Sequence, residues 1–273
     1  ADMSVAATRM PVAFIPHGGG PWPFVDLGMD KSEVQHLSAY LHELASLPKR
    51  KPRAVLVISA HWEERVPTLL SGAHPPLLFD YYGFPAESYE LTWPAPGAPP
   101  ELQQRVSQLL HAAGFETAQD PERGFDHGTF VPLKLTYPHA DMPILQLSLL
   151  RGLDPALHLR LGAALAALRD EDIFIVGSGM SFHNLRGFRD PRSREPAQRF
   201  HAWLNETVKL DPPERAQRLT RWVDAPDARY VHPREEHLLP LMIVVGAAQE
   251  DRGQTAWSGT VLGMPVCAYH FGS

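Results

Sequence analysis

Three histidines follow short apolar runs along the chain. His17 follows VAFIP, His61 follows RAVLVISA, and His183 lies just beyond DIFIVGSGM. Continuous apolar runs of this length are typical of strands that are buried on both faces of a parallel sheet. Ligands of such sheets bind beyond the carboxyl ends of the strands. A lone histidine at a strand end is most often an ordinary polar residue, but three in the same topological position predict one shared site.

The chemistry that imidazole offers at such a site is metal binding. Neutral imidazole suits Zn, Fe, Cu or Ni, so the residue type alone leaves the metal open. About three protein ligands with further positions open would make a catalytic rather than a structural site. The Gly-rich HGGGP segment after the first strand lacks a nucleotide-binding pattern, and we interpret its glycines as allowing a close backbone approach.

Two further histidines stand in unusual settings. His127 lies in the Gly-flanked turn GFDHGT, ahead of an apolar helix-like segment, and His237 lies in REEHLLPL beside Glu235 and Glu236. For the two acids the favoured interpretation is first-turn carboxylates, which a helix dipole stabilises. A neutral histidine has no such reason to stand at a helix start, which favours a functional role for His237.

The remaining histidines divide into two groups among the 14 of the chain. His232 and His270 are left undecided. The others are interpreted as solvated side chains on helix faces or loops: His36, His42, His74, His111, His139, His158 and His201.

Strand and helix patterns alternate along the chain. Strands are expected at 12–16, 53–60, 143–149, 172–178 and 265–270, and helices at 32–47, 101–113, 154–168, 195–208 and 236–248. Ser32 is expected to open the first helix, and Asp154 with Pro155 the third. The alternation predicts one α/β sandwich domain over residues 12–273, around a mainly parallel sheet. Residues 1–11 are expected to be a flexible leader or an expression remnant.

Composition excludes several classes of function. The net charge is −6 and no Lys/Arg cluster is interleaved with aromatic residues, so nucleic-acid binding has no electrostatic footprint. No apolar run approaches the roughly 20 residues of a membrane span, and the first ten residues do not resemble a signal peptide. We therefore expect a cytoplasmic protein. The single Cys267 excludes an internal disulfide and is expected to be a small buried hydrophobic side chain.

Five motifs in order resemble the class III extradiol ring-cleavage dioxygenases, and most closely their 4,5-DOPA dioxygenase extradiol-like branch. The motifs are HGGGP from residue 17, SAHW from 59, FDHGTF from 125, GSGMSFHN from 177 and REEHLLPL from 234. The resemblance runs from about Val12 to Phe271. It implies a single α/β domain with a mixed central sheet and a non-haem metal site.

The resemblance also implies roles for the histidines. By it, His17, His61 and His237 are the metal ligands. His183 is an acid/base close to the metal, which some members use as a ligand, and His127 is a substrate-contacting or proton-shuttling residue.

The third ligand departs from part of the class. Protocatechuate-type members complete the site with a carboxylate, whereas this chain has His237 with Glu235 and Glu236 beside it. Three neutral imidazoles leave the full 2+ charge on the metal, which suits an anionic catecholate but is also typical of zinc sites. Fe(II) is expected as the active metal, with Zn(II) as an alternative occupant.

The resemblance implies that the substrates are a small aromatic diol and dioxygen, with a ring-opened semialdehyde as product. The enzyme is expected to be a monomer or a small homo-oligomer. Trp62, Phe125 and Tyr82 are predicted to contact the substrate, with Phe130 and Tyr81 as further candidates for an aromatic wall.

Other functions compete with this interpretation. The main alternative is a zinc-dependent hydrolase or amidase that activates water at the same histidines, although no HExxH motif is present. Another is a metal-binding scaffold without catalysis. A serine hydrolase is disfavoured because the residue two before Ser178 is Val176, so no nucleophile elbow is completed.

Overall fold

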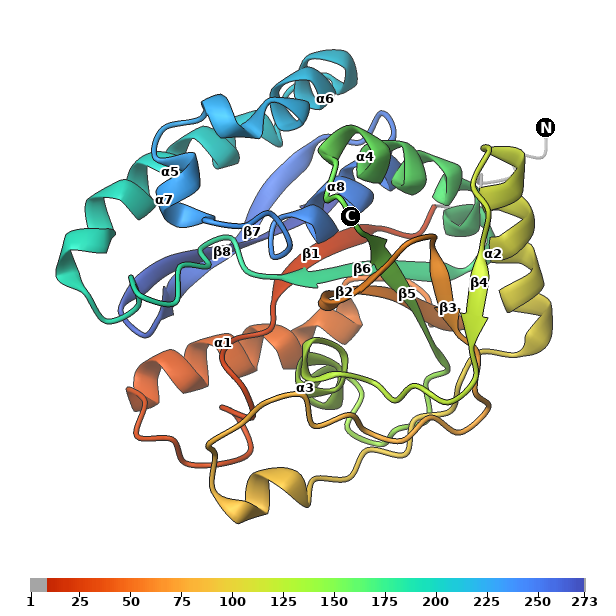
Figure 1. Cartoon of the computed structure of the whole chain (residues 1–273), viewed down its shortest axis with the longest axis horizontal. Coiled ribbons are helices and arrows are strands. Elements are labelled where there is room, and N and C mark those ends of the chain that lie inside the picture. The colour runs from red at the N-terminus through yellow and green to blue at the C-terminus, as the bar shows by residue number, and fades with distance from the viewer. Residues whose placement is uncertain (1–8, 273) are drawn as a thin grey trace, which may run out of the picture.

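A twisted sheet with helices on both faces forms the body of the protein (Figure 1). The structure is a computed structural model that describes residues 9–272. Within these residues the strands are β1 (Val12–Pro16), β2 (Ala54–Glu64), β3 (Thr68–Leu70), β4 (Ala118–Asp120), β5 (Ile144–Leu150), β6 (Ile173–Gly179), β7 (Gly253–Val261) and β8 (Met264–Phe271). They form one sheet of order β4-β3-β5-β2-β6-β1-β8-β7.

The centre of the sheet is parallel, and antiparallel pairs lie on both sides of it, with β3 antiparallel to β5 on one side. β6 pairs in parallel with both β1 and β2, and β2 pairs in parallel with β5. β8 runs antiparallel to β1, and β7 antiparallel to β8. The predicted α/β fold with a mixed, mainly parallel sheet is confirmed.

Helices cover both faces of the sheet. They are α1 (Lys31–Glu43), α2 (Pro100–Ala112), α3 (His127–Thr136), α4 (Pro155–Ala164), α5 (Arg194–Thr207), α6 (Pro212–Thr220), α7 (Ala228–Val231) and α8 (Leu239–Ala248). Figure 1 shows α1 and α3 on one face, and α4 and α8 on the other, where α8 packs between α4 and strands β1 and β6. No helix within residues 9–272 has the length and apolar character to cross a membrane.

The strands that the sequence predicted are the largely buried ones. Every residue of β1, β5 and β6 is buried, which matches the continuous apolar runs. β7 was not predicted because it lies at the edge of the sheet, where its burial alternates and polar residues fill the exposed positions. β3 and β4 have three residues each, too few for a periodic signal.

Two predicted helix starts are wrong. Asp30, not Ser32, caps α1, because its carboxylate accepts from the backbone N–H groups of Ser32 and Glu33. α8 begins at Leu239 rather than at residue 236. Pro240 has no N–H group and is tolerated in the first turn of a helix, so a start four residues before it is disfavoured.

The folded structure reaches back before β1. Of the predicted leader, residues 1–8 lie outside the described residues. Met10 is buried, and its N–H donates to the carbonyl of Arg169 at 2.9 Å. The Arg169 Nε–H donates back to the Met10 carbonyl at 2.7 Å.

Two histidines that were interpreted as solvated are buried. The Nδ1–H of His158 donates to the Asp154 carbonyl, and its Nε2 accepts from the Leu150 N–H at 3.1 Å. The Nδ1–H of His201 donates to the Ala197 carbonyl, and its Nε2 accepts from the Ser181 hydroxyl at 2.7 Å. Both use a helix carbonyl four residues back, which amphipathic periodicity cannot reveal. Cys267 is buried as predicted.

Burial of His201 predicts a pH-dependent stability. Burial lowers its pKa to about 4, against about 6.5 in an unfolded chain. The unfolded chain therefore binds more protons as the pH falls from 6.5 to 4, and the folded state loses stability across that window, by about 2 kcal/mol at pH 5 from this one group. In thermal melts from pH 7 to 4.5, His201→Gln should show a shallower fall of Tm with pH than the parent. His42→Gln, at an exposed site, is the control and should keep the parent slope.

Candidate metal centre

His17 and His61 come from the carboxyl ends of β1 and β2, the two parallel strands that flank β6. His17 directly follows β1, and its N–H donates to the carbonyl of Gly179 at the end of β6. His61 lies near the end of β2, where the register against β5 shifts between Ile58 and Glu63. Such a bulge turns a strand locally and redirects its side chains, here at the edge where the strands end.

His237 reaches the same edge from the loop before α8. Its carbonyl accepts from the N–H of Met180 at 3.1 Å, which ties this loop to the end of β6. The approach is close, because a Cβ on Gly179 would lie 2.2 Å from the His237 carbonyl oxygen. Glycine at 179 is therefore a condition for the position of His237.

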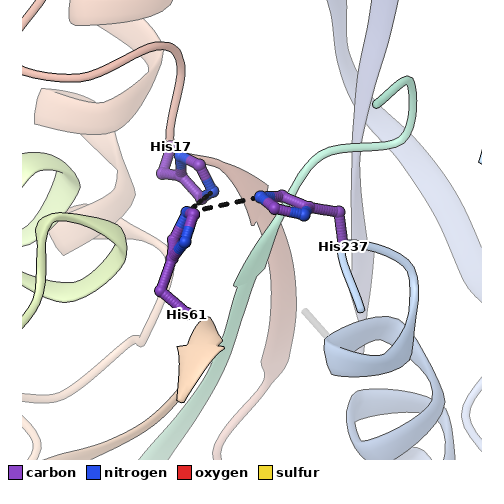
Figure 2. Close-up of side chains that lie close together, drawn as sticks. All are labelled: His17, His61 and His237. Atoms are coloured by element: carbon purple, nitrogen blue, oxygen red, sulfur yellow. Dashed lines mark hydrogen bonds between the residues drawn. The ribbon is translucent and has the colours of Figure 1, made fainter. Parts of the chain in front are cut away.

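The three imidazole rings point at one another (Figure 2). The Nε2 atoms of His17 and His61 are 3.2 Å apart, and those of His61 and His237 are 3.3 Å apart. A tetrahedral metal with Zn–N bonds of about 2.0–2.1 Å would hold two ligand nitrogens about 3.3 Å apart. Right-angled octahedral positions at the same bond length would hold them about 3 Å apart. The spacing therefore fits a metal ion between the rings.

The far ring nitrogens fix which nitrogen faces inward. The Nδ1–H of His17 donates to the Gly18 carbonyl at 2.7 Å, and that of His237 donates to the Glu236 carboxylate at 3.2 Å. The Nε2 atoms of His17 and His237 therefore carry their lone pairs toward the common point. An acceptor behind the ring is the usual support for a metal-bound histidine.

Burial keeps these imidazoles neutral. It lowers the pKa of His17 and His237 well below the ordinary value, and the other histidines of the cluster lower them further. Burial, then the nearby His127, lowers the pKa of His61 to about 4. At neutral pH the three side chains are free of protons that would compete with a metal.

His127 opens α3 beside the cluster and is held by Asp80. Its ring centre is 4.0 Å from that of His61 and 5.3 Å from that of His17. Asp80 Oδ1 accepts from both the backbone N–H (2.9 Å) and the Nδ1–H (2.7 Å) of His127. The carboxylate thus fixes the tautomer and leaves Nε2 of His127 as an acceptor.

No sequence pattern identified Asp80 as a residue of the site. It precedes His127 by 47 residues and lies in an irregular segment without a motif. The only signal nearby was the aromatic pair Tyr81 and Tyr82.

Asp126, the neighbour of His127, holds the start of α3 against the sheet. Its buried carboxylate accepts from Ser59 of β2, Gln146 of β5, Arg123 and the N–H of Gly128. Burial by itself would raise its pKa, but Arg123 and these hydrogen bonds bring the pKa below the ordinary value. The charged carboxylate therefore fixes His127 relative to β2, which carries His61.

His183 lies one ring away from the converging nitrogens. It stacks on His237 with ring centres 3.4 Å apart and an interplanar angle of 8°. It groups with Glu236 and His237 rather than with His17 and His61. Burial, then the other histidines, lowers its pKa to about 4.

Glu235 and Glu236 precede α8, so their interpretation as first-turn carboxylates is wrong. Glu235 pairs with Arg229, and Glu236 lies within 3.5 Å of Arg234. Arginines, not the dipole of a helix, balance these two charges, and the neutral His237 donates a hydrogen bond to Glu236.

The predicted aromatic contacts lie around the cluster rather than in it. Tyr82 is 91% exposed, Phe125 is fully buried against Trp93, and Trp62 lies under the guanidinium of Arg123. Their contact with a substrate stays a prediction. Among the five candidates, Tyr81 is the one whose ring meets the cluster, edge-on to His127 at 5.7 Å.

Comparison with known proteins places this centre in a family. Residues 11–271 match the family described as the catalytic LigB subunit of aromatic ring-opening dioxygenase. The chain is 41% identical to dioxygenase tasH of Hapsidospora irregularis, an alignment that covers 98% of this chain and 88% of that one. It is 36% identical to 4,5-DOPA dioxygenase extradiol of Beta vulgaris, with 91% and 92% covered.

A sequence match and a structural match from Escherichia coli K12 extend the comparison. The chain is 35% identical to its 4,5-DOPA dioxygenase extradiol over 90% of this chain and 88% of that one. The crystal structure of an uncharacterized protein superposes with a TM-score of 0.78 at 31% identity, covering 97% of this chain and all of the other. The chain therefore belongs to the LigB family and is an aromatic ring-opening dioxygenase of the extradiol type.

Proposed function

We propose that this enzyme opens the ring of a catechol with dioxygen at an Fe(II) ion held by His17, His61 and His237. The observation that carries the proposal is the convergence of three neutral Nε2 atoms at 3.2 and 3.3 Å. Relatives named 4,5-DOPA dioxygenase extradiol support a catechol as the substrate. When bound, the iron would supply open positions for the two catechol oxygens and electrons for dioxygen.

The histidines beside the ligands would handle the protons. A catechol hydroxyl has a pKa near that of tyrosine, roughly 10, so its ionisation at neutral pH needs a nearby base. Nε2 of His127 is such an acceptor, because Asp80 holds the ring proton on Nδ1. When His127 takes the substrate proton, the Asp80 carboxylate stabilises the imidazolium. His183, which stacks on His237, would act as the second acid/base.

Burial of the predicted ligands would favour binding of the substrate anion to the metal. His17 and His237 are each 2% exposed, so these two imidazoles are shielded from bulk water. Exclusion of water strengthens the attraction between a bound cation and a catecholate.

The experiment that tests the function measures oxygen and product mass. Protein freed of metal would be loaded without oxygen with Fe(II), Mn(II) or Zn(II), and then given a panel of catechols in air. We expect one dioxygen consumed per catechol and a yellow product heavier by two oxygen atoms. A zinc hydrolase would consume no oxygen and leave the ring intact. No oxygen uptake across the panel, with iron verified in the protein, would overturn the proposal.

The metal ligands can be separated from the neighbouring acid/base. We expect about one metal per chain, lost in His17→Ala, His61→Ala and His237→Ala. His183→Ala should keep the metal and lose roughly 10²–10⁴ in turnover, the usual contribution of one proton-transfer group. Elemental analysis with kinetics decides this. Parallel loss of metal and activity in His183→Ala would make His183 a ligand, and full metal in His237→Ala would transfer that role to a neighbouring glutamate.

Removal of the Asp80 carboxylate should impair turnover without removing the metal. In Asp80→Ala, His127 loses the acceptor for its Nδ1–H and for its backbone N–H. We expect kcat to fall by about 10–100-fold, as for other partners of this kind, with unchanged metal content. Asp26→Ala is the matched control, because Asp26 is an exposed loop carboxylate that also accepts a backbone N–H. Parent-like kcat in Asp80→Ala would show that His127 needs no such orientation.

A further inference from the structure

We propose that the indole of Trp22 holds His17 in the orientation in which it binds the metal, so that Trp22 is a positioning residue of the metal centre. The inference rests on the proposed function in one respect, because it takes His17 to be a metal ligand. Removal of the indole should therefore weaken metal binding, which can be measured without the ring-opening reaction.

The three predicted ligands differ in what fixes their backbone. His61 lies within β2, and His237 lies in a loop whose carbonyl bonds to Met180 at the end of β6. His17 follows the last residue of β1 and precedes residues 18–20, which are all glycine. Glycine has access to more backbone conformations than any other residue, so this segment by itself gives His17 little support.

Trp22 closes the glycine segment into a tight turn. Its indole Nε1–H donates to the His17 carbonyl at 2.7 Å, in a buried place. On the other side, the N–H of His17 donates to the Gly179 carbonyl at 3.1 Å. Both backbone polar groups of His17 are thus bonded, one to the end of β6 and one to the indole. In this turn, a buried side chain does the work that a neighbouring strand does for β2.

The indole also packs directly on Gly18. A Cβ at Gly18 would lie 2.2 Å from Trp22 Nε1, and this glycine has a φ of +74°. The Gly18 carbonyl is the group that accepts the Nδ1–H of His17, at 2.7 Å. Trp22 therefore contacts both the backbone of His17 and the residue whose carbonyl keeps the Nδ1 proton away from the other ligands.

The far end of the turn packs against a segment that contacts His127. Gly20 has a φ of +56°, and a Cβ on it would lie 2.6 Å from Phe84 Cζ. Phe84 lies edge-on to Tyr81, with ring centres 5.1 Å apart, and Tyr81 lies edge-on to His127. The turn is thus confined between these aromatic rings and the indole of Trp22. Removal of the indole frees one side of it.

The test measures metal affinity in a tryptophan variant. Trp22→Phe keeps an aromatic side chain beside Gly18 and removes the indole N–H. We expect its dissociation constant for Zn(II), measured by competition with a chromogenic chelator, to rise about 10–100-fold, as for other groups that support a metal ligand. The visible spectrum of Co(II) bound in the same place reports the ligands of the ion and should change as well.

Trp93→Phe is the matched control. Like Trp22, Trp93 is 3% exposed, and its Nε1–H donates to a backbone carbonyl, that of Tyr137, at 2.9 Å. Its ring packs against Phe125. The two variants should lose similar stability in the metal-free protein, measured as Tm, while only Trp22→Phe should lose affinity for zinc.

A second measurement needs no variant. Because coupling between two interactions is reciprocal, an indole that strengthens metal binding must itself be bonded more firmly when the metal is bound. Hydrogen exchange of the Trp22 indole N–H, followed by NMR, should slow by about tenfold or more on addition of Zn(II). Exchange of the Trp93 indole N–H should keep its rate.

The outcomes separate this inference from the proposed function. Parent-like zinc affinity in Trp22→Phe, an equal loss in Trp93→Phe, or unchanged exchange of the Trp22 indole on zinc binding would overturn the role of Trp22. If Trp22→Phe does not fold, the exchange measurement alone decides. Undiminished zinc affinity in His17→Ala would instead remove His17 from the metal centre, and the proposed ligand set would fail together with this inference.

Discussion

The site depends on three imidazole Nε2 atoms that face one another, with that of His61 3.2 Å from that of His17 and 3.3 Å from that of His237. Without a cation between them this arrangement is unfavourable, because one shared proton cannot satisfy three acceptors in a buried place. Burial holds the rings neutral, and acceptors at Gly18 and Glu236 keep two of the Nδ1 protons on the outside. The facing nitrogens therefore destabilise the metal-free protein, and a divalent metal bound between them would remove this destabilisation.

The sheet determines the edge at which the histidines meet, and glycines allow the neighbouring segments to approach closely. Parallel pairing of β1 and β2 with β6 sends their carboxyl ends to one edge, so His17 and His61 meet without any special loop. His237 comes from a different layer and needs the missing side chain of Gly179 to approach. Gly128 has the same function for α3, because a Cβ there would lie 2.3 Å from Ser59 Oγ.

Whether the sequence could predict a feature depends on how far apart along the chain its interacting residues lie. The buried strands and the histidines at their ends were predictable, since apolar runs and strand topology are local signals. His127 and His237 were recognised through motifs, not through periodicity. Asp80 could not be predicted, because only the folded chain brings it to His127. The prediction that His158 is solvated was wrong for a related reason, since the carbonyl and the N–H that bond its ring come together only in the folded chain.

In a two-histidine, one-carboxylate site a carboxylate binds the metal directly, whereas here His237 would take that position and a carboxylate lies behind it. Glu236 does not join the three converging nitrogens, but its carboxylate accepts the Nδ1–H of His237, one residue behind the predicted ligand. A carboxylate in that place makes the imidazole a stronger donor while leaving the 2+ charge of a bound metal formally uncompensated. Arg234, which faces Glu236, is itself balanced by Glu63. The surplus positive charge at this centre would therefore be that of the bound metal, which the proposed catecholate would neutralise.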